Sequence, residues 1–170
     1  MLRTILALSL FLLGSAASVP AQDAHPAAHS TPAFDQIKSL AGEWEGKNSS
    51  GSPTKIYYTV ISNGSVVMEH LGPSTSHEMV TMYSLDGDRI LVTHYCAAGN
   101  QPVMETSPSP AANGKYDFSF VRVSGTKTPD EPHMSALVLS IPDKDHLTQT
   151  WTFDNHGKPL VDTFTYTRVK

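Results

Sequence analysis

The chain has 170 residues, of which 12 are lysine or arginine and 16 are aspartate or glutamate, and its formal net charge is −4. This weakly acidic balance contains no block of like charges. It lacks the basic stripe of a nucleic-acid-binding protein and the basic amphipathic segment of a membrane-surface protein. The single cysteine, Cys96, cannot form an internal disulfide, so the fold must be held by side-chain packing alone.

The first 21 residues have the pattern of a cleavable signal peptide. Arg3 supplies a positive charge, Ile5 to Leu13 form an apolar stretch with one serine, and Val19-Pro20-Ala21 fits a signal peptidase site. The apolar stretch is shorter than the roughly 20 residues that a membrane-spanning helix needs. We therefore predict cleavage after Ala21 and a secreted or periplasmic protein without a membrane anchor.

The next segment, residues 22–33, is mostly Ala, His, Pro, Ser and Thr and predicts a disordered leader. Phe34, Ile37 and Leu40 then recur every three positions, which predicts one face of a short helix. From this helix to the end, the chain consists of short segments of alternating polarity, with no change in composition that would mark a domain boundary. We therefore predict a single domain over residues 34–170.

Short segments of alternating polarity, separated by turn signals, follow this helix and are typical of an antiparallel sheet. Asn63-Gly64 predicts a type I′ hairpin turn, and Asp86-Gly87-Asp88 predicts another tight turn. About ten strands are predicted, over residues 43–47, 54–62, 65–71, 78–85, 89–96, 103–106, 114–123, 137–141, 147–153 and 163–168. Because closure removes exposed sheet edges and short sequential hairpins favour simple topology, we predict an all-β, antiparallel up-and-down barrel.

Two features of this pattern resemble the lipocalin-like (calycin) superfamily. Gly42-Glu43-Trp44 lies between the helix and the strand series, and Arg168 lies in the last strand. In that superfamily a Gly-x-Trp motif opens the first strand, and its Trp packs beside an Arg or Lys at the closed end of the barrel. The resemblance implies structural closure by Gly42, Trp44 and Arg168, with a cation–π contact of about 0.5–2 kcal/mol.

A second stretch carries a narrower resemblance. Asp86-Gly87-Asp88-Arg89, together with Thr93 to Pro102, is similar to a block found in bacterial secreted proteins of unknown function with lipocalin-like folds. The likeness implies the same fold and no particular activity.

Three positions predicted to face inward allow more than one interpretation. His94 and Cys96 are two residues apart on a strand and share a face, and His133 has the parity of the apolar positions on its own strand. Two histidines and a thiolate could bind zinc, copper or haem iron. Alternatively, His94 is a buried histidine bonded to Gln149 or Tyr116, and Cys96 is a small apolar filler. We favour the second interpretation and assign no metal or cofactor.

The predicted interior mixes apolar walls with a few polar groups, as in barrels that hold a small ligand. The predicted ligand-binding residues are Tyr58, Met68, His94, Cys96, Phe118, Phe120, Gln149 and Trp151. We therefore predict an exported binding protein for a small apolar or amphipathic molecule. No complete catalytic motif is present, so an enzyme is less favoured. The alternatives are a haem- or metal-binding barrel that uses His94 or His133, and an interaction module with a solid core.

Overall fold

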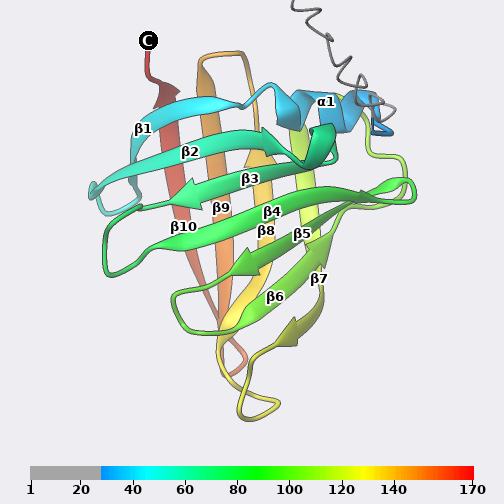
Figure 1. Cartoon of the computed structure of the whole chain (residues 1–170). Coiled ribbons are helices and arrows are strands. Elements are labelled where there is room, and N and C mark those ends of the chain that lie inside the picture. Colours follow the sequence, from blue (N-terminus) through cyan, green and yellow to red (C-terminus); the bar gives the residue numbers. More distant parts are fainter. Residues whose placement is uncertain (1–27) are drawn as a thin grey trace, which may run out of the picture.

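The structure is a computed structural model that describes residues 28–170, as one short helix and ten strands (Figure 1). In chain order the elements are α1 Pro32–Lys38, β1 Gly42–Asn48, β2 Pro53–Ile61, the single 3-10 turn η1 Ser62–Gly64, β3 Val66–Leu71, β4 Met79–Asp86, β5 Arg89–Tyr95, β6 Gln101–Glu105, β7 Lys115–Ser124, β8 His133–Ser140, β9 His146–Asn155 and β10 Lys158–Arg168. The predicted signal peptide, residues 1–21, lies outside the described residues, as do residues 22–27 of the predicted leader.

The ten strands form a closed antiparallel barrel in which each strand pairs with its neighbours in the chain and β1 pairs with β10. The prediction of an all-β, up-and-down barrel with a short N-terminal helix is confirmed. The clearest differences are the starts of β8 and β10, which lie several residues earlier than predicted. His133 pairs with Asp154, and Lys158 pairs with Asn155, so pairing to β9 extends both strands beyond their alternating segments.

The predicted hairpin at Asn63-Gly64 forms, with Ile61 paired to Val66. A type I′ turn has two residues with a positive φ. Here there are three in a row, because Ser62, with a φ of 51°, precedes Asn63 and Gly64. The Ser65 N–H donates to the Ser62 carbonyl at 3.2 Å and closes the turn. The register of β2 and β3 is therefore the one that the sequence predicts.

Helix α1 begins at Pro32, two residues before the predicted start. The Thr31 hydroxyl accepts a hydrogen bond from the Phe34 N–H at 3.2 Å, and proline is favoured in the first turn because it lacks an N–H donor. The predicted apolar face is buried: Phe34 and Ile37 are both 0% exposed. Figure 1 shows α1 beside the turn between β2 and β3, so the helix covers one end of the barrel. We call this the closed end.

Antiparallel connectivity places alternate loops at opposite ends of the barrel. The β1–β2 hairpin loop, the loop between β3 and β4 and the long loop between β7 and β8 lie away from α1, at what we call the open end (Figure 1). Along the wall, threonines of β9 and β10 face outward, where the Thr150 and Thr163 hydroxyls lie 3.2 Å apart. The apolar core lies inside the barrel and beneath α1.

Candidate functional site

The closed end is sealed by Arg168, which extends from β10 toward the end of α1. Its guanidinium carbon lies 4.2 Å from the centre of the Trp44 ring. The same group donates to the carbonyls of Ser39, Ala41 and Lys144, at 2.8 Å each. Carbonyls at the end of a helix have no partner within the helix, so the guanidinium supplies hydrogen bonds to the chain that leaves α1. This arrangement is structural, because it ties β10 to the chain after α1 and to the loop between β8 and β9.

Trp44 and Gly42 complete this seal. Trp44 is 0% exposed, and its indole N–H donates to the Leu40 carbonyl at 2.8 Å. Gly42 has a φ of +130°, and a Cβ there would lie 3.0 Å from Arg168 Nη1. A side chain at Gly42 would therefore strain the backbone and crowd the guanidinium.

The middle of the barrel contains a network of buried polar side chains from four strands. Glu69 is 0% exposed and accepts hydrogen bonds from the Tyr83 hydroxyl at 2.6 Å and from Gln149 Nε2 at 2.7 Å. Gln149 Nε2 also donates to the Tyr58 hydroxyl at 2.7 Å, and Gln149 Oε1 accepts from Trp151 Nε1 at 3.1 Å. These groups use their hydrogen-bonding capacity on one another, so they link the walls of the barrel.

Glu69 is a carboxyl group buried within this network. Burial raises the pKa of Glu69, and the hydrogen bonds from Tyr83 and Gln149 act in the opposite direction because they stabilise the charged form. Burial also raises the pKa of the Tyr58 and Tyr83 hydroxyls, and the negative charge of Glu69 adds to this effect. Both phenols therefore stay protonated at neutral pH and remain hydrogen-bond donors.

His94 lies next to this network, 1% exposed. Its Nδ1 atom is 2.9 Å from the Thr81 hydroxyl, and its ring centre is 4.7 Å from that of Trp151. Burial lowers the pKa of His94 to about 4, so the ring is neutral at neutral pH. Its Nε2 atom is buried and has no hydrogen-bond partner within residues 28–170. The predicted partners, Gln149 and Tyr116, do not bond to it; Thr81 does.

Met68 does not face the interior as predicted. On β3 the buried side chains are Val67, Glu69 and Leu71, so strand alternation places Met68 on the outer face. Of the other predicted ligand-binding residues, Phe118 is 2% exposed and part of the core.

Phe120, Cys96 and His133 lie apart from the buried network. Phe120 is 41% exposed, and its ring centre lies 4.8 Å from that of His133. His133 Nδ1 contacts the Glu131 carbonyl at 2.8 Å. A bulge between Met134 and Ala136 shifts the register of β8, so the parity that predicted an inward His133 does not hold. Cys96 follows the last residue of β5 and is half-buried.

The alternative interpretation, a metal site made of two histidines and a thiolate, is not assembled. Among residues 28–170, no three His, Cys, Asp or Glu side chains lie close enough together to hold a metal ion.

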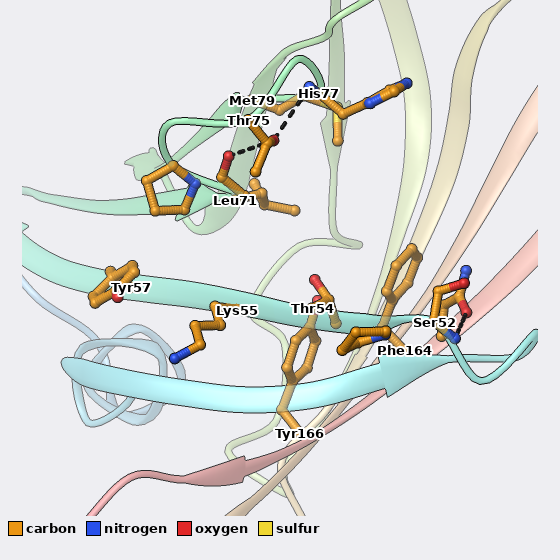
Figure 2. Close-up of a pocket in the computed structure, with 14 residues that line it drawn as sticks. Ser52, Thr54, Lys55, Tyr57, Leu71, Thr75, His77, Met79, Phe164 and Tyr166 are labelled. Atoms are coloured by element: carbon orange, nitrogen blue, oxygen red, sulfur yellow. Dashed lines mark hydrogen bonds between the residues drawn. The ribbon is translucent and has the colours of Figure 1, made fainter.

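The structure has a pocket of about 860 Å³ at the open end, which we call the mouth pocket (Figure 2). It lies between the β1–β2 hairpin, the β3–β4 loop and two aromatic side chains of β10. Its apolar lining is Pro53, Leu71, Pro73, Met79, Phe164 and Tyr166. Its polar lining includes Thr54, Lys55, Thr75 and His77. None of the predicted ligand-binding residues lines it.

The mouth pocket opens where the pairing of β2 with β3 stops. The last hydrogen bond between them runs from the Gly72 N–H to the Lys55 carbonyl at 3.1 Å. Beyond it, Pro53 and Thr54 form the end of β2 that pairs only with β1, while the chain after Gly72 turns away into the β3–β4 loop. The barrel wall is therefore open at this corner, and Figure 2 shows the gap between β2 and that loop.

The walls of the mouth pocket are apolar and come from opposite sides. Phe164 and Tyr166 are stacked, with ring centres 6.3 Å apart and an interplanar angle of 7°. Leu71 and Met79 are cross-strand partners of β3 and β4. Leu71 is 7% exposed and Tyr166 is 3% exposed, so both reach the core and mark the floor of the pocket.

Gly46 makes room for the Tyr166 ring. A Cβ on Gly46 would lie 2.0 Å from the Thr165 carbonyl oxygen and 2.8 Å from Tyr166 Cδ1. We expect Gly46→Ala to lower the free energy of unfolding by about 1–3 kcal/mol, since the added carbon forces the backbone of β10 to move. Urea unfolding followed by circular dichroism measures this. Gly87→Ala is the control for a new Cβ without a clash: nothing lies within 4 Å of that site, and its φ of +61° adds a backbone cost of about 1 kcal/mol. An equal effect in the two variants would contradict the steric explanation.

Sequence reasoning missed the mouth pocket because its residues belong to a loop and to strand ends. Phe164, Tyr166 and Arg168 share one face of the last strand, and the alternation of the sequence predicts that this face points inward. That alternation was the signal from which the two aromatic residues of the pocket could have been found. The β3–β4 loop, residues 72–78, has no periodicity, so nothing in the sequence places Thr75 or His77 beside β10.

The comparisons with known proteins bear on the fold alone. No protein-family model matches the chain, and no curated protein sequence matches it. Within residues 28–170, no helix is long and apolar enough to cross a membrane. A solved structure of a protein of unknown function from the DUF3598 family of Nostoc punctiforme is similar, with a TM-score of 0.52 and 16% identity. The match covers 79% of this chain and 49% of that one, so this chain spans about half the length of its structural neighbour.

Proposed function

We propose that the protein is an exported, lipocalin-like binding protein that holds a small, largely apolar molecule in the mouth pocket. The observation that carries this proposal is an apolar-walled pocket of about 860 Å³ at the open end of a closed barrel. Pockets of this size and lining are typical of small-molecule sites. The expected export rests on the signal-peptide pattern of residues 1–21.

The interior residues favour the mouth over the barrel centre as the binding place. Glu69, Gln149 and Tyr58 are 0–3% exposed and hydrogen-bond to one another. A ligand in the centre would have to break these bonds and leave buried polar groups unpaired, which costs about 1–3 kcal/mol for each group. A ligand in the mouth pocket covers Phe164 and Met79 without disturbing the network.

Blocking the mouth pocket tests the proposal. We expect the protein to bind N-phenyl-1-naphthylamine, an uncharged fluorescent probe of apolar sites, and Met79→Trp to weaken this binding at least about tenfold by filling the pocket. Met82→Trp is the matched control, because it introduces the same ring on the same strand. Met82 alternates with the buried Thr81 and Tyr83, so it faces outward. Fluorescence titration gives the dissociation constants.

Two results would contradict the proposal. One is an absence of probe binding by the unmodified protein; the other is equal weakening by Met79→Trp and Met82→Trp. Native mass spectrometry of protein purified from its host is expected to show a bound organic molecule that Met79→Trp loses.

A second candidate function is haem or metal binding, and one observation favours it. His94 Nε2 is a buried nitrogen without a hydrogen-bond partner in the described part of the chain, and a neutral imidazole is a good metal ligand. If the protein takes up haem, a Soret band is expected that His94→Ala removes. If the band persists in His94→Ala, His94 is not the haem ligand, and His133→Ala is then tested in the same way.

A further inference from the structure

The floor of the mouth pocket contains a hydroxyl that the fold leaves without a hydrogen bond. The Tyr166 hydroxyl oxygen is buried and has no hydrogen-bond partner within residues 28–170. Figure 2 shows Tyr166 reaching from β10 toward Thr54, with Phe164 beside it. Thr54 lies close enough to act on Tyr166 and lowers the pKa of its hydroxyl, against the larger effect of burial, but the two hydroxyls do not have hydrogen-bond geometry. A buried donor without an acceptor is unfavourable. A ligand that supplies the acceptor therefore removes this cost, and the whole of the gain contributes to the free energy of binding.

Tyr166 is a donor at neutral pH. Burial raises the pKa of its hydroxyl, and the negative charge of Glu69 raises it further. The same surroundings disfavour a negative charge on the ligand. Asp162 on β10 is a second negative charge that raises the pKa of Tyr166, and it accepts a hydrogen bond at 3.2 Å from Asn48, a residue of the pocket lining.

The basic side chains of the lining, Lys55 and His77, do not lie beside the Tyr166 hydroxyl. Lys55 alternates with the buried Ile56, and its Nζ atom lies 2.5 Å from the Glu45 carboxylate on the outer face of the barrel, on the other side of β2 from Tyr166. His77 belongs to the exposed part of the β3–β4 loop, where its Nδ1 atom lies 3.1 Å from the Ser76 hydroxyl. An anionic head group at Tyr166 would therefore lose its hydration without gaining a counter-charge.

From this arrangement we infer that the ligand bears an uncharged oxygen group, an alcohol or a carbonyl, that accepts a hydrogen bond from Tyr166. Its apolar body lies between the stacked rings of β10 and the side chains of Leu71 and Met79. The inference rests on the proposed function and narrows it to a class of ligand: neutral amphipathic molecules rather than fatty acids or other anions.

Competition between ligands of equal chain length tests the inference. In the full chain we expect decan-1-ol to displace N-phenyl-1-naphthylamine at a concentration at least about tenfold lower than decanoate does at pH 8, where the acid is ionised. Tyr166→Phe removes the hydroxyl and keeps the ring. It is expected to weaken decan-1-ol binding about fivefold to tenfold and to leave decanoate binding unchanged. Tyr57→Phe is the matched control, since Tyr57 also lines the pocket, on the outer side of β2.

The outcomes separate the two proposals. If the fluorescent probe binds but decanoate competes as well as decan-1-ol, or if Tyr166→Phe and Tyr57→Phe have equal effects on the alcohol, the inference is wrong and the mouth pocket remains a binding site. If the unmodified protein binds neither the probe nor either competitor, the proposed function fails and the inference fails with it. Unchanged probe affinity in Tyr166→Phe verifies that the variant is folded.

Discussion

Replacing Trp44 with alanine is expected to lower the free energy of unfolding by about 3–5 kcal/mol, the range for removing a fully buried large aromatic ring. Trp44 is 0% exposed, and its indole lies beneath the Arg168 guanidinium and beside the end of α1. Its loss leaves a cavity at the closed end and removes the apolar surface on which the helix rests. Urea unfolding followed by circular dichroism measures the change.

The expected loss is specific to the closed end. Tyr95→Ala removes a large aromatic ring from an outer position that is 47% exposed, so we expect a change within about 0.5 kcal/mol. Arg168→Lys keeps a positive charge near Trp44 but loses the planar group that donates to Ser39 and Ala41, and we expect an intermediate effect. Equal stability of Trp44→Ala and Tyr95→Ala would show that the seal does not hold the fold together.

Acidification is expected to cost about 3 kcal/mol of stability through His94 alone. Burial lowers the pKa of His94 from 6.5 to about 4, so the unfolded chain takes up a proton on this residue at a higher pH than the folded one. The stabilising contribution is therefore complete above about pH 6.5 and is lost progressively as the pH falls toward 4. Urea unfolding at a series of pH values between 4 and 8 measures it.

The difference between the unmodified protein and His94→Gln isolates this effect. Glu69 acts in the opposite direction, because its pKa is raised in the folded protein. Its contribution is present below the unfolded value of about 4.5 and is lost as the pH rises through the folded one. Both proteins contain Glu69, so its contribution cancels in the difference. A stability difference that does not change between pH 7 and pH 4 would show that His94 is not held neutral by burial. His133→Gln, which removes a histidine outside the network, is expected to retain the pH dependence of the unmodified protein.

The buried network explains why inward polar residues do not by themselves mark a binding site. In a barrel, polar side chains on facing walls can reach one another across the interior, and each bond formed there removes a group from contact with a ligand. Gln149 uses both its amide nitrogen and its amide oxygen in this way, and Glu69 uses both carboxyl oxygens. The hydroxyl of Tyr166 differs from these groups, because no side chain or backbone group of the described residues bonds to it and Tyr166 lines a pocket.

The sequence by itself determined the barrel, because strand alternation, turn residues and hairpin order are local properties. Asn63-Gly64 sets the register of one hairpin, and the threonines of β9 and β10 mark an outer face without reference to the rest of the chain. The inward parity of Tyr58, His94, Gln149 and Trp151 was also readable. It failed for His133, where a bulge in β8 shifts the alternation, and for Met68, which alternates with the buried residues of β3.

Only the tertiary structure decided what the inward residues contact and where the wall opens. Glu69 and Gln149 are 80 residues apart in the chain, yet they bond across the interior because β3 and β9 face each other in the closed barrel. The mouth pocket likewise depends on the point where β3 leaves β2 and on the distance from the β3–β4 loop to β10. Closure of the barrel fixes such distances, and a local pattern of polarity contains no information about side chains on opposite walls.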